Sequence, residues 1–377
     1  MMQPPPLSLY VHFPWCVRKC PYCDFNSHPA KGELPEAAYL DQLLHDLDRD
    51  LQYAPHRTIE TIFIGGGTPS LISGRTIAAL LDGVRDRAAV AGDAEVTLEA
   101  NPGAVDEANF AAYRAAGVNR LSIGAQSFNA AHLASLGRIH DPHQIERAVT
   151  AAKVAGFNRF NLDLMHGLPG QTVDDAVSDL QRALLLGASH VSWYQLTIEP
   201  RTEFAQHPPQ LPDEDALGAI ESAGLAMLSS FGLRRYEVSA YASDGEAARH
   251  NLNYWMFGDY LGIGAGAHGK ITFAERNEIV RTGKPLAPSR YLGVAPTELR
   301  SEALITLDAR PGEFLLNALR LVDGVDSRLF EPRTGCSLST IDGAWETLLT
   351  RGLVRADRLA VTELGLRYLD SVVSEFI

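Results

Sequence analysis

Short apolar runs rich in β-branched and aromatic residues alternate with longer amphipathic stretches from Leu7 to about Leu196. In the amphipathic stretches, such as those that start at Tyr39, Thr76 and Asp174, apolar residues recur every three or four positions, as in a helix buried on one face. Strand–helix alternation favours parallel strands joined by right-handed crossovers. Six units in a row predict an α/β fold, a (β/α)6 sheet curled into a partial barrel, with strands that start at Leu7, Thr61, Glu95, Arg120, Arg159 and His190.

The pattern changes after about Pro285. Helical patterns start at Pro311 and Ser337, a hairpin pattern follows in LVRADRLAVT, and a last helical pattern runs from Glu363 to Phe376. Helices followed by a short hairpin are typical of a winged-helix module. We therefore predict two domains: the partial barrel over residues 1–285, and a small, mostly helical, winged-helix-like domain over residues 286–377.

Charge and the length of apolar runs narrow the range of partners. The 377 residues include 33 Lys and Arg and 46 Asp and Glu, which gives a formal net charge of −13. An acidic chain has no general electrostatic attraction to nucleic acid, so we expect no nucleic-acid partner. No run of about 18 apolar residues occurs, so stable membrane insertion is not expected. The N-terminus lacks the features of a signal peptide, and we expect a cytoplasmic protein.

Three of the four cysteines, Cys16, Cys20 and Cys23, lie within eight residues, directly after the first predicted strand. Their C-x3-C-x2-C spacing is too short for a disulfide framework, and in a reducing compartment such a group favours metal binding. Three thiolates on one loop can hold three corners of a [4Fe–4S] cluster and leave the fourth iron open to an external ligand. The alternative is a zinc site, for which His12 or His28 could supply a fourth ligand.

Polar and glycine-rich residues follow the next predicted strands, at the ends where a parallel α/β barrel gathers its reactive groups. Glycines let a ligand approach the backbone, a Glu can accept hydrogen bonds from hydroxyls or an ammonium group, and the Arg fork suits a carboxylate. The residues at these positions are Gly66, Gly67 and Thr68 after the second strand, Glu99 after the third, Gln126 and Arg138 after the fourth, and Asp163 on the fifth.

Each of these residues also has a purely structural interpretation. The glycines could form a tight strand-to-helix turn, and Glu99 could be a surface or salt-bridged residue. Asp163 lies in an apolar strand and should be paired or bound, because an unpaired buried charge costs several kcal/mol. A structural ion pair between Arg138 and Asp163 would meet that need. Cys336, far from the cysteine loop, is expected to be a small buried hydrophobic residue.

The segment YVHFPWCVRKCPYCDFNSH, together with GGGTPS and the later strand ends, resembles the radical SAM superfamily. Within that superfamily it is similar to the oxygen-independent coproporphyrinogen oxidase-like branch, which includes haem chaperones, and the resemblance runs over most of the chain. It implies a [4Fe–4S] cluster on Cys16, Cys20 and Cys23, with S-adenosylmethionine (SAM) on the fourth iron. It also implies a cofactor pocket formed by Tyr10, Tyr22, Gly66, Gly67, Thr68, Glu99, Gln126, Arg138, Asp163 and Thr197.

Two further segments carry the same resemblance. HNLNYW, residues 250–255, places the imidazole of His250 beside aromatic residues, and imidazole is a common axial ligand of haem iron. The alternative is a hydrogen-bonded His250 packed under Trp255. YLGIGAGAHG, residues 260–269, is expected to be a loop that approaches a ligand closely, with His268 able to close over SAM.

Two departures separate the sequence from the oxidases of this branch. Those enzymes extend the loop to C-x3-C-x2-C-x-C, whereas Phe25 occupies the fourth position here, and they carry a long N-terminal extension, whereas nine residues precede Tyr10 here. Loss of a thiol and of a cover would weaken the shielding of a radical. The resemblance therefore implies a chaperone that binds haem, the cluster and SAM, and that delivers haem to an acceptor such as a membrane-bound respiratory enzyme. The alternative is a radical SAM oxidative decarboxylase of coproporphyrinogen III or a related tetrapyrrole.

Overall fold

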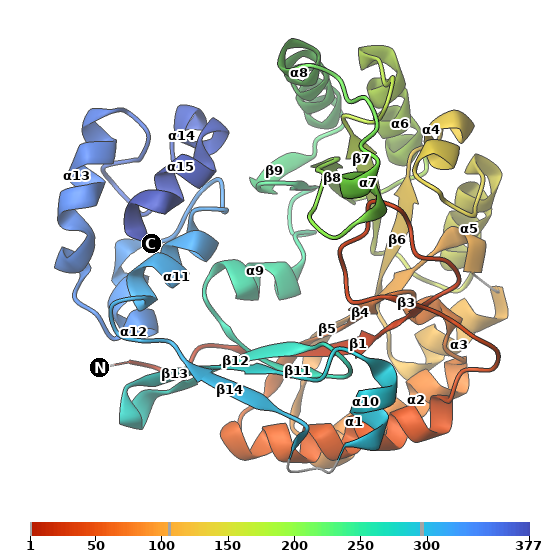
Figure 1. Ribbon diagram of the computed structural model, residues 1–377, viewed down its shortest axis with the longest axis horizontal. Helices are drawn as coiled ribbons and strands as arrows, with labels where there is room; N and C mark the ends of the chain where they lie inside the picture. Colours follow the sequence, from red (N-terminus) through yellow and green to blue (C-terminus); the bar gives the residue numbers. More distant parts are fainter. Residues whose placement is uncertain (1, 105–106, 295–297) are drawn as a thin grey trace.

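One open sheet runs through the computed structural model, which describes residues 2–104, 107–294 and 298–377. Its described strands follow the order β14-β13-β12-β11-β1-β4-β5-β6-β7-β8-β10-β9, and Figure 1 shows how the sheet curves around the centre of the molecule. The strands are β1 (Leu7–Phe13), β4 (Ile59–Gly66), β5 (Val90–Ala100), β6 (Arg120–Gln126), β7 (Phe160–His166), β8 (His190–Gln195), β9 (Arg234–Glu237), β10 (Ala240–Ala242), β11 (Asp259–Ile263), β12 (His268–Phe273), β13 (Glu278–Gly283) and β14 (Ser301–Leu304).

The parallel centre of the sheet confirms the predicted barrel and adds a strand to it. The six predicted strands pair in parallel in the order β1-β4-β5-β6-β7-β8. The added strand is β11, which pairs in parallel with β1, and β12 begins at His268. The prediction of a loop over residues 260–269 is therefore wrong at both ends, and only residues 264–267 connect the two strands. Strands β12, β13 and β14 continue the sheet in antiparallel fashion beyond β11.

Helices cover the outer face of the parallel strands (Figure 1). Their starts follow from capping chemistry: the side chain of Ser73 accepts a hydrogen bond from the backbone of Thr76, and Asp141 and Thr172 form capping boxes. These and neighbouring helices are α1 (Glu36–Asp50), α2 (Gly74–Arg87), α3 (Glu107–Ala116), α4 (Ala130–Ser135), α5 (Pro142–Val154), α6 (Val173–Leu185), α7 (Glu203–Gln206), α8 (Glu214–Ser230), α9 (Arg249–Trp255) and α10 (Pro288–Gly293).

The C-terminal part has its own apolar core, which includes the buried Cys336. Met2, Phe257 and Ile279 from the first part pack into the same core, so the two parts interlock. The division at residue 285 stays a prediction. The elements here are α11 (Arg310–Ala318), α12 (Phe330–Thr334), α13 (Asp342–Thr350), α14 (Glu363–Arg367) and α15 (Leu369–Val373). Within the described ranges, no helix is long and apolar enough to cross a membrane.

The predicted last helix and hairpin are shorter than expected. Residues 363–376 form α14, α15 and a final 3-10 turn, because the chain leaves the helical region at Tyr368, where φ is −116° and ψ is 31°. The hairpin is reduced to a single antiparallel bridge between Val354 and Val361.

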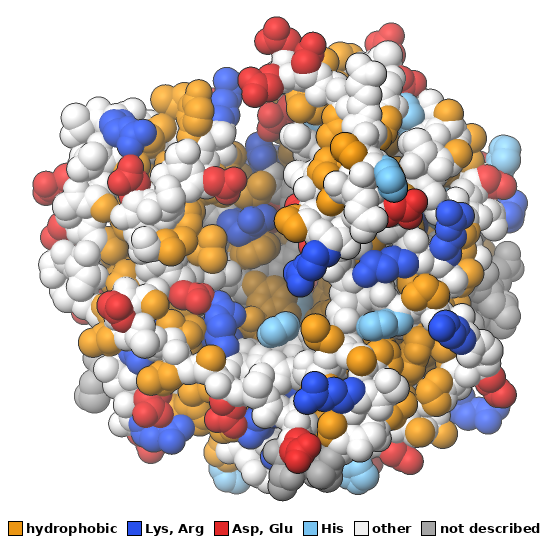
Figure 2. Space-filling view, in the orientation of Figure 1, with side chains coloured by type: hydrophobic (Ala, Val, Ile, Leu, Met, Phe, Trp, Pro, Cys, Tyr) orange, Lys and Arg blue, Asp and Glu red, His pale blue; other side chains and the backbone are white. Residues whose placement is uncertain are grey.

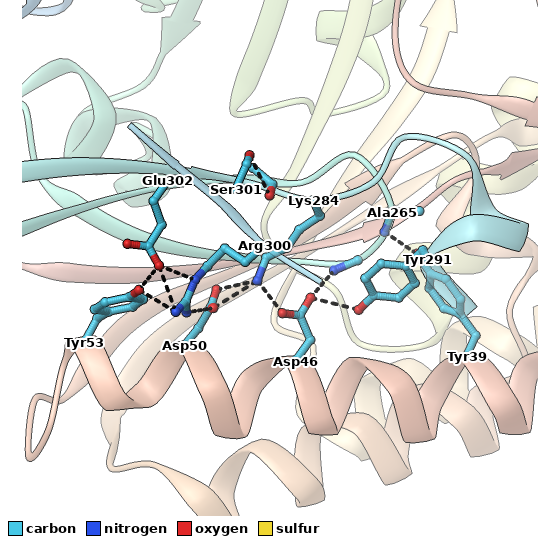
Figure 3. Close-up of polar contacts among 12 residues, drawn as sticks. Tyr39, Asp46, Asp50, Tyr53, Ala265, Lys284, Tyr291, Arg300, Ser301 and Glu302 are labelled. Carbon is cyan, nitrogen blue, oxygen red and sulfur yellow. Dashed lines mark hydrogen bonds and ion pairs between the residues drawn. The ribbon is translucent and has the colours of Figure 1, made fainter. Parts of the chain in front are cut away.

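A buried ionic network ties α1 to the segment that follows β13 (Figure 3). Asp46 and Asp50 lie one helical turn apart, and the ammonium group of Lys284 pairs with both carboxylates. Asp50 also accepts a hydrogen bond from Arg300 at 2.8 Å, and Asp46 accepts one from the hydroxyl of Tyr291 at 2.8 Å. Asp46 further accepts from the backbone N–H of residue 264 at 3.2 Å, so the network holds the turn that connects β11 to β12.

Candidate functional site

The three clustered cysteines lie where β1 ends, at the same edge of the sheet as the carboxyl ends of the other parallel strands. Cys16 is in the short strand β2 (Trp15–Cys16), which pairs with β3 (His28–Pro29) and is buried. Cys20 and Cys23 are half-buried, and the three free thiols line one cavity of about 430 Å³, called here the cluster cavity. Burial raises the pKa of the Cys16 and Cys23 thiols, and a bound metal would reverse that shift because it takes the thiolate form.

A zinc site would need a fourth ligand beside the three thiols. The two candidate fourth ligands have other partners. His12 hydrogen-bonds to the Tyr10 hydroxyl and to the Asn26 carbonyl, both at 2.8 Å, and Nε2 of His28 lies 3.1 Å from Asn26 Oδ1.

The glycine motif after β4 packs directly against the cysteine loop. Gly66 has a φ of +124°, and a Cβ there would lie 2.6 Å from the carbonyl oxygen of Phe13. A Cβ on Gly67 would overlap the carbonyl oxygen of Trp15. Only glycine fits both positions, which brings this backbone and the buried Thr68 to the wall of the cluster cavity.

Glu99, at the end of β5, faces the same cavity. Its Oε2 accepts a hydrogen bond from the backbone N–H of Gly66 at 2.9 Å. Burial, followed by the nearby charge of Asp163, raises the pKa of Glu99 to about 8. A carboxyl group held partly neutral in this way can ionise when a cationic group, such as an ammonium, binds beside it.

Gln126, Arg138 and Asp163 line the same cavity. Gln126 has a φ of +67° where β6 ends, and its Oε1 accepts a hydrogen bond from Tyr194 at 2.7 Å. Asp163 accepts hydrogen bonds from Asn161 at 2.7 Å and from Ser122 at 3.0 Å, and burial raises its pKa.

Arg138 connects this side of the cavity to the cysteine loop. Its Nη2 donates to the carbonyl of Gly124 at 2.8 Å, and Nη1 lies 3.7 Å from the sulfur of Cys20. The structural ion pair with Asp163 is therefore not what these two described side chains form. The Nε of Arg138 is buried without a hydrogen-bond partner among the described residues, so one donor of the guanidinium is left for a ligand acceptor.

Tyr22 and Thr197 complete the cluster cavity. The Tyr22 ring lies 6.4 Å from that of Phe204, and burial raises the pKa of its hydroxyl. Thr197 is exposed and donates a hydrogen bond to Glu199 at 2.8 Å. Both therefore line the same cavity as the three thiols.

A second cavity of about 810 Å³, called here the large cavity, adjoins the first. Tyr10 and His268 line it, and neither lines the cluster cavity. Figure 2 shows the hollow near the centre of this face, with hydrophobic side chains at its floor and Lys and Arg around it. The two cavities share a wall made of Lys19, Cys23, Asp24, Phe25, Gly66, Glu99 and Glu199.

His250 does not line either cavity. It is 1% exposed, with Nδ1 2.7 Å from the hydroxyl of Thr61 and Nε2 2.8 Å from that of Tyr254. Burial lowers its pKa to about 3, so the ring is neutral. This geometry favours a hydrogen-bonded His250 over an axial haem ligand. Its ring is held by Thr61 and Tyr254 rather than by packing under Trp255.

Sequence reasoning missed the residues that support the site. Ser122, Asn161 and Tyr194 hold Asp163 and Gln126 in place. A signal for them was present, because positions two apart on a strand share a face, and Asn161 and Asp163 are such a pair. The aromatic wall of the large cavity comes from α9 and β11, the two segments whose sequences HNLNYW and YLGIGAGAHG already suggested a site, although the sequence did not show that they share one cavity.

An open parallel sheet with three free thiols on the loop after its first strand defines a radical SAM protein. In agreement, residues 10–183 match the model of the radical SAM superfamily, and residues 305–368 match that of the HemN C-terminal domain. The chain belongs to the HemW family of haem chaperones within that superfamily. It is 48% identical over 379 aligned residues to the haem chaperone HemW of Escherichia coli (strain K12), with 100% of each chain covered.

Two further comparisons agree with this assignment. The haem chaperone HemW of Haemophilus influenzae is 47% identical, with 99% of this chain and 98% of the relative covered. The structure of coproporphyrinogen III oxidase HemN from Escherichia coli superposes with a TM-score of 0.82 at 24% identity, and covers 99% of this chain and 90% of that one. At that identity the match to HemN supports the fold alone. As a radical SAM protein, the chain takes a [4Fe–4S] cluster and SAM.

Proposed function

We propose that this protein is a haem chaperone, which receives haem in the large cavity and passes it to an acceptor protein. The observation that carries the proposal is the large cavity itself. Its volume of about 810 Å³ lies within the range of roughly 300–1,000 Å³ that is typical of small-molecule sites. Its shared wall with the cluster cavity would bring haem next to the cluster, and the relatives with the highest identity given above are named as haem chaperones.

The cofactor assignments belong to the same proposal. Cys16, Cys20 and Cys23 would hold the cluster, which when bound can supply an electron to SAM. The backbone of Gly66, Gly67 and Thr68 would let the methionine end of SAM approach closely. Glu99 would accept from its ammonium group or ribose, and the free donor of Arg138 would meet its carboxylate. Gln126 and Asp163, each fixed by protein hydrogen bonds, would orient the remaining polar groups.

The proposal extends to the acceptor and to the compartment. We propose a haem-requiring acceptor, such as a membrane-bound respiratory enzyme, and a cytoplasmic site of action. A reducing compartment suits the proposal because it keeps the three thiols free for iron.

The test is anaerobic purification followed by counts of iron, sulfide and haem on the same sample. We expect about four iron and four sulfide ions per chain and a Soret band that grows to one equivalent of added haem. Absence of that band at stoichiometric haem would contradict the chaperone function. Formation of 5′-deoxyadenosine together with a vinyl product from coproporphyrinogen III at catalytic rates would instead support the oxidative decarboxylase.

A matched pair of glycine variants tests the SAM assignment. Gly67→Ala places a methyl group against the carbonyl of Trp15, whereas a Cβ on Gly92 meets nothing within 4 Å. We expect Gly67→Ala to lose most SAM binding by equilibrium dialysis and Gly92→Ala to keep it. Equal binding in both variants would remove the glycine motif from the SAM site.

A further inference from the structure

The large cavity contains few groups that are free to bind iron. Among its described lining residues, the aromatic hydroxyls already have partners: Tyr10 with His12 at 2.8 Å, Tyr254 with His250 at 2.8 Å, and Tyr260 with Arg281 at 3.3 Å. A group with such a partner must break a buried hydrogen bond before it can coordinate a metal, which costs free energy.

The histidines in and beside the large cavity differ in whether their ring nitrogens already have hydrogen-bond partners. Both ring nitrogens of His12 are hydrogen-bonded, as are both ring nitrogens of His250. His268 begins β12, lines the cavity and is exposed, and its ring has no hydrogen-bond partner among the described residues. It is therefore the imidazole of this cavity that can bind iron without the loss of an existing contact.

We propose that His268 is the axial ligand of haem iron in the large cavity, an inference that rests on the proposed haem chaperone function. A ring nitrogen of His268 donates a lone pair to the iron, and no electron is transferred in this step. This assignment moves His268 away from SAM, where the sequence placed it. It also gives His250 a different part: its Nε2 fixes the hydroxyl of Tyr254, and so positions an aromatic ring at the cavity wall.

The charges around the cavity suit the two propionate groups of haem. Lys270 is paired with Asp259 at 2.9 Å, and Arg281 is paired with Glu313. By contrast, Lys19 and Arg201 are exposed and have no carboxylate partner among the described residues. They offer two cations to two carboxylates, and an Arg can hold a carboxylate with two parallel hydrogen bonds.

Aromatic side chains line the cavity and can stack on an apolar macrocycle. Tyr254 and Trp255 come from α9, and Phe25 comes from the cysteine loop. Three acidic residues, Asp24, Glu99 and Glu199, line the cavity as well, so we expect the net attraction for propionates to be modest.

Haem titration of His268→Ala in the full chain tests the axial ligand. We expect the variant to lose the optical and electron paramagnetic resonance signals of imidazole-ligated haem and to bind haem about tenfold or more weakly, because even outer partners of metal ligands cost 10–100-fold. Added free imidazole should fill the gap and restore the signals. His207→Ala, an exposed histidine that does not line this cavity, is the matched control and should leave both unchanged.

A second variant separates ligation from positioning. His250→Gln should keep the imidazole-ligated spectrum while haem affinity falls, because the ring contacts with Thr61 and Tyr254 are lost while His268 is intact. An unchanged spectrum in His268→Ala, or loss of imidazole signals in His250→Gln with His268 intact, would overturn the assignment. Failure of the parent protein to bind haem at all would instead overturn the proposed function, so the two results are distinguishable.

The salt dependence of haem binding tests whether Lys19 and Arg201 contact the propionates. The double variant Lys19→Ala/Arg201→Ala should bind haem several-fold more weakly at low salt, and the difference should shrink at high salt because exposed charges are screened. Haem dimethyl ester, which lacks the propionate charges, should bind parent and variant equally. A preference of the parent for the ester would contradict this part of the proposal.

Discussion

The two cavities share a wall but differ in whether their polar side chains are held in place by other protein groups. In the cluster cavity, Gln126 and Asp163 are already held by protein hydrogen bonds, and Arg138 is held by a backbone carbonyl. In the large cavity the tyrosine hydroxyls, Lys270 and Arg281 are also held, but His268 and Arg201 have no hydrogen-bond or ion-pair partner among the described residues. Groups fixed in advance suit a resident cofactor, because little ordering is left for binding to cost. Groups left free suit a cargo that must also leave.

The walls of the cavities also depend on different parts of the chain. The cluster cavity is built from the ends of consecutive parallel strands, whereas the large cavity needs β11, β12 and α9. The turn that leads to His268 is held through the ionic network: Asp46 accepts from the backbone of residue 264, and Lys284 donates its backbone N–H to Ala267 at 3.0 Å. The large cavity should therefore be the more sensitive of the two to damage in that network.

Of the substitutions that test this difference between the cavities, Lys284→Met should have the largest effect. It leaves Asp46 and Asp50 buried, with Arg300 as their one remaining ion-pair partner among the described residues, and breaking a buried pair in this way costs about 3–5 kcal/mol. We expect a fall of that size in the free energy of unfolding, measured by urea titration. Haem binding of the folded variant at low temperature should fall more than its iron content does.

The control for this prediction is Lys31→Met, an exposed lysine, which should change stability by less than about 0.5 kcal/mol. A change below about 1 kcal/mol in Lys284→Met would mean that the network adds little net stability. Equal losses of haem and iron would mean that the two cavities do not depend on separate parts of the chain.

The next effect in size is a pH dependence in the cluster cavity. The pKa of Glu99 is about 8 in the folded protein against 4.5 for an ordinary Glu, so between these values the folded state holds a proton that the unfolded state has lost. The contribution of Glu99 to the free energy of unfolding is therefore fully present below about pH 4.5 and is lost as pH rises toward 8.

The Glu99→Gln variant removes this dependence because it is always neutral. In protein free of cluster and SAM, we expect the variant to gain about 1–3 kcal/mol over the parent between pH 5 and pH 8, with the upper limit reduced by partial solvent screening. Urea unfolding at several pH values measures this, with the exposed Glu60→Gln as control. A constant difference across the pH range would mean that Glu99 is ionised throughout.

The cluster cavity was the more predictable of the two from sequence. Each of its main residues follows its own strand, and parallel strands bring their carboxyl ends to one edge, so strand order alone placed Gly66, Glu99, Gln126 and Asp163 together. Strand order did not predict which hydrogen-bond partners these side chains have. Whether Asp163 meets Arg138 or Asn161 depends on side-chain directions that adjacent backbones decide.

The large cavity was harder to predict because part of its wall comes from a glycine-rich segment that was interpreted as a loop. The run DYLGIGAGAHG indicated a loop in close contact with a ligand, and the close contact exists, but its partner is the protein's own next strand. A Cβ on Gly262 would overlap the carbonyl oxygen of His268, so glycine is required for β11 and β12 to approach each other. Asp46 and Asp50 were similarly overlooked. They lie at i and i+4 on the face of α1 that also buries Leu43 and Leu47, a position that calls for a buried cation.

The smallest predicted effect concerns Phe25, which belongs to both cavities. Its side chain is 64% exposed, so Phe25→Ala should change the free energy of unfolding by less than about 0.5 kcal/mol. If the ring packs on haem, its loss should weaken haem binding by about 0.5–1.5 kcal/mol, the usual worth of one aromatic contact. Iron and sulfide content should not change, since Phe25 is not among the three thiol residues.

Val17→Ala provides the matched control, because Val17 lies on the same loop, is 48% exposed and lines neither cavity. It should match the parent in both haem affinity and iron content. A Phe25→Ala variant that loses iron but keeps haem affinity would assign the ring to the cluster cavity. The residue that stands where the oxidases carry a fourth thiol would then protect the cluster rather than hold the cargo, and the two cavities would no longer divide as proposed.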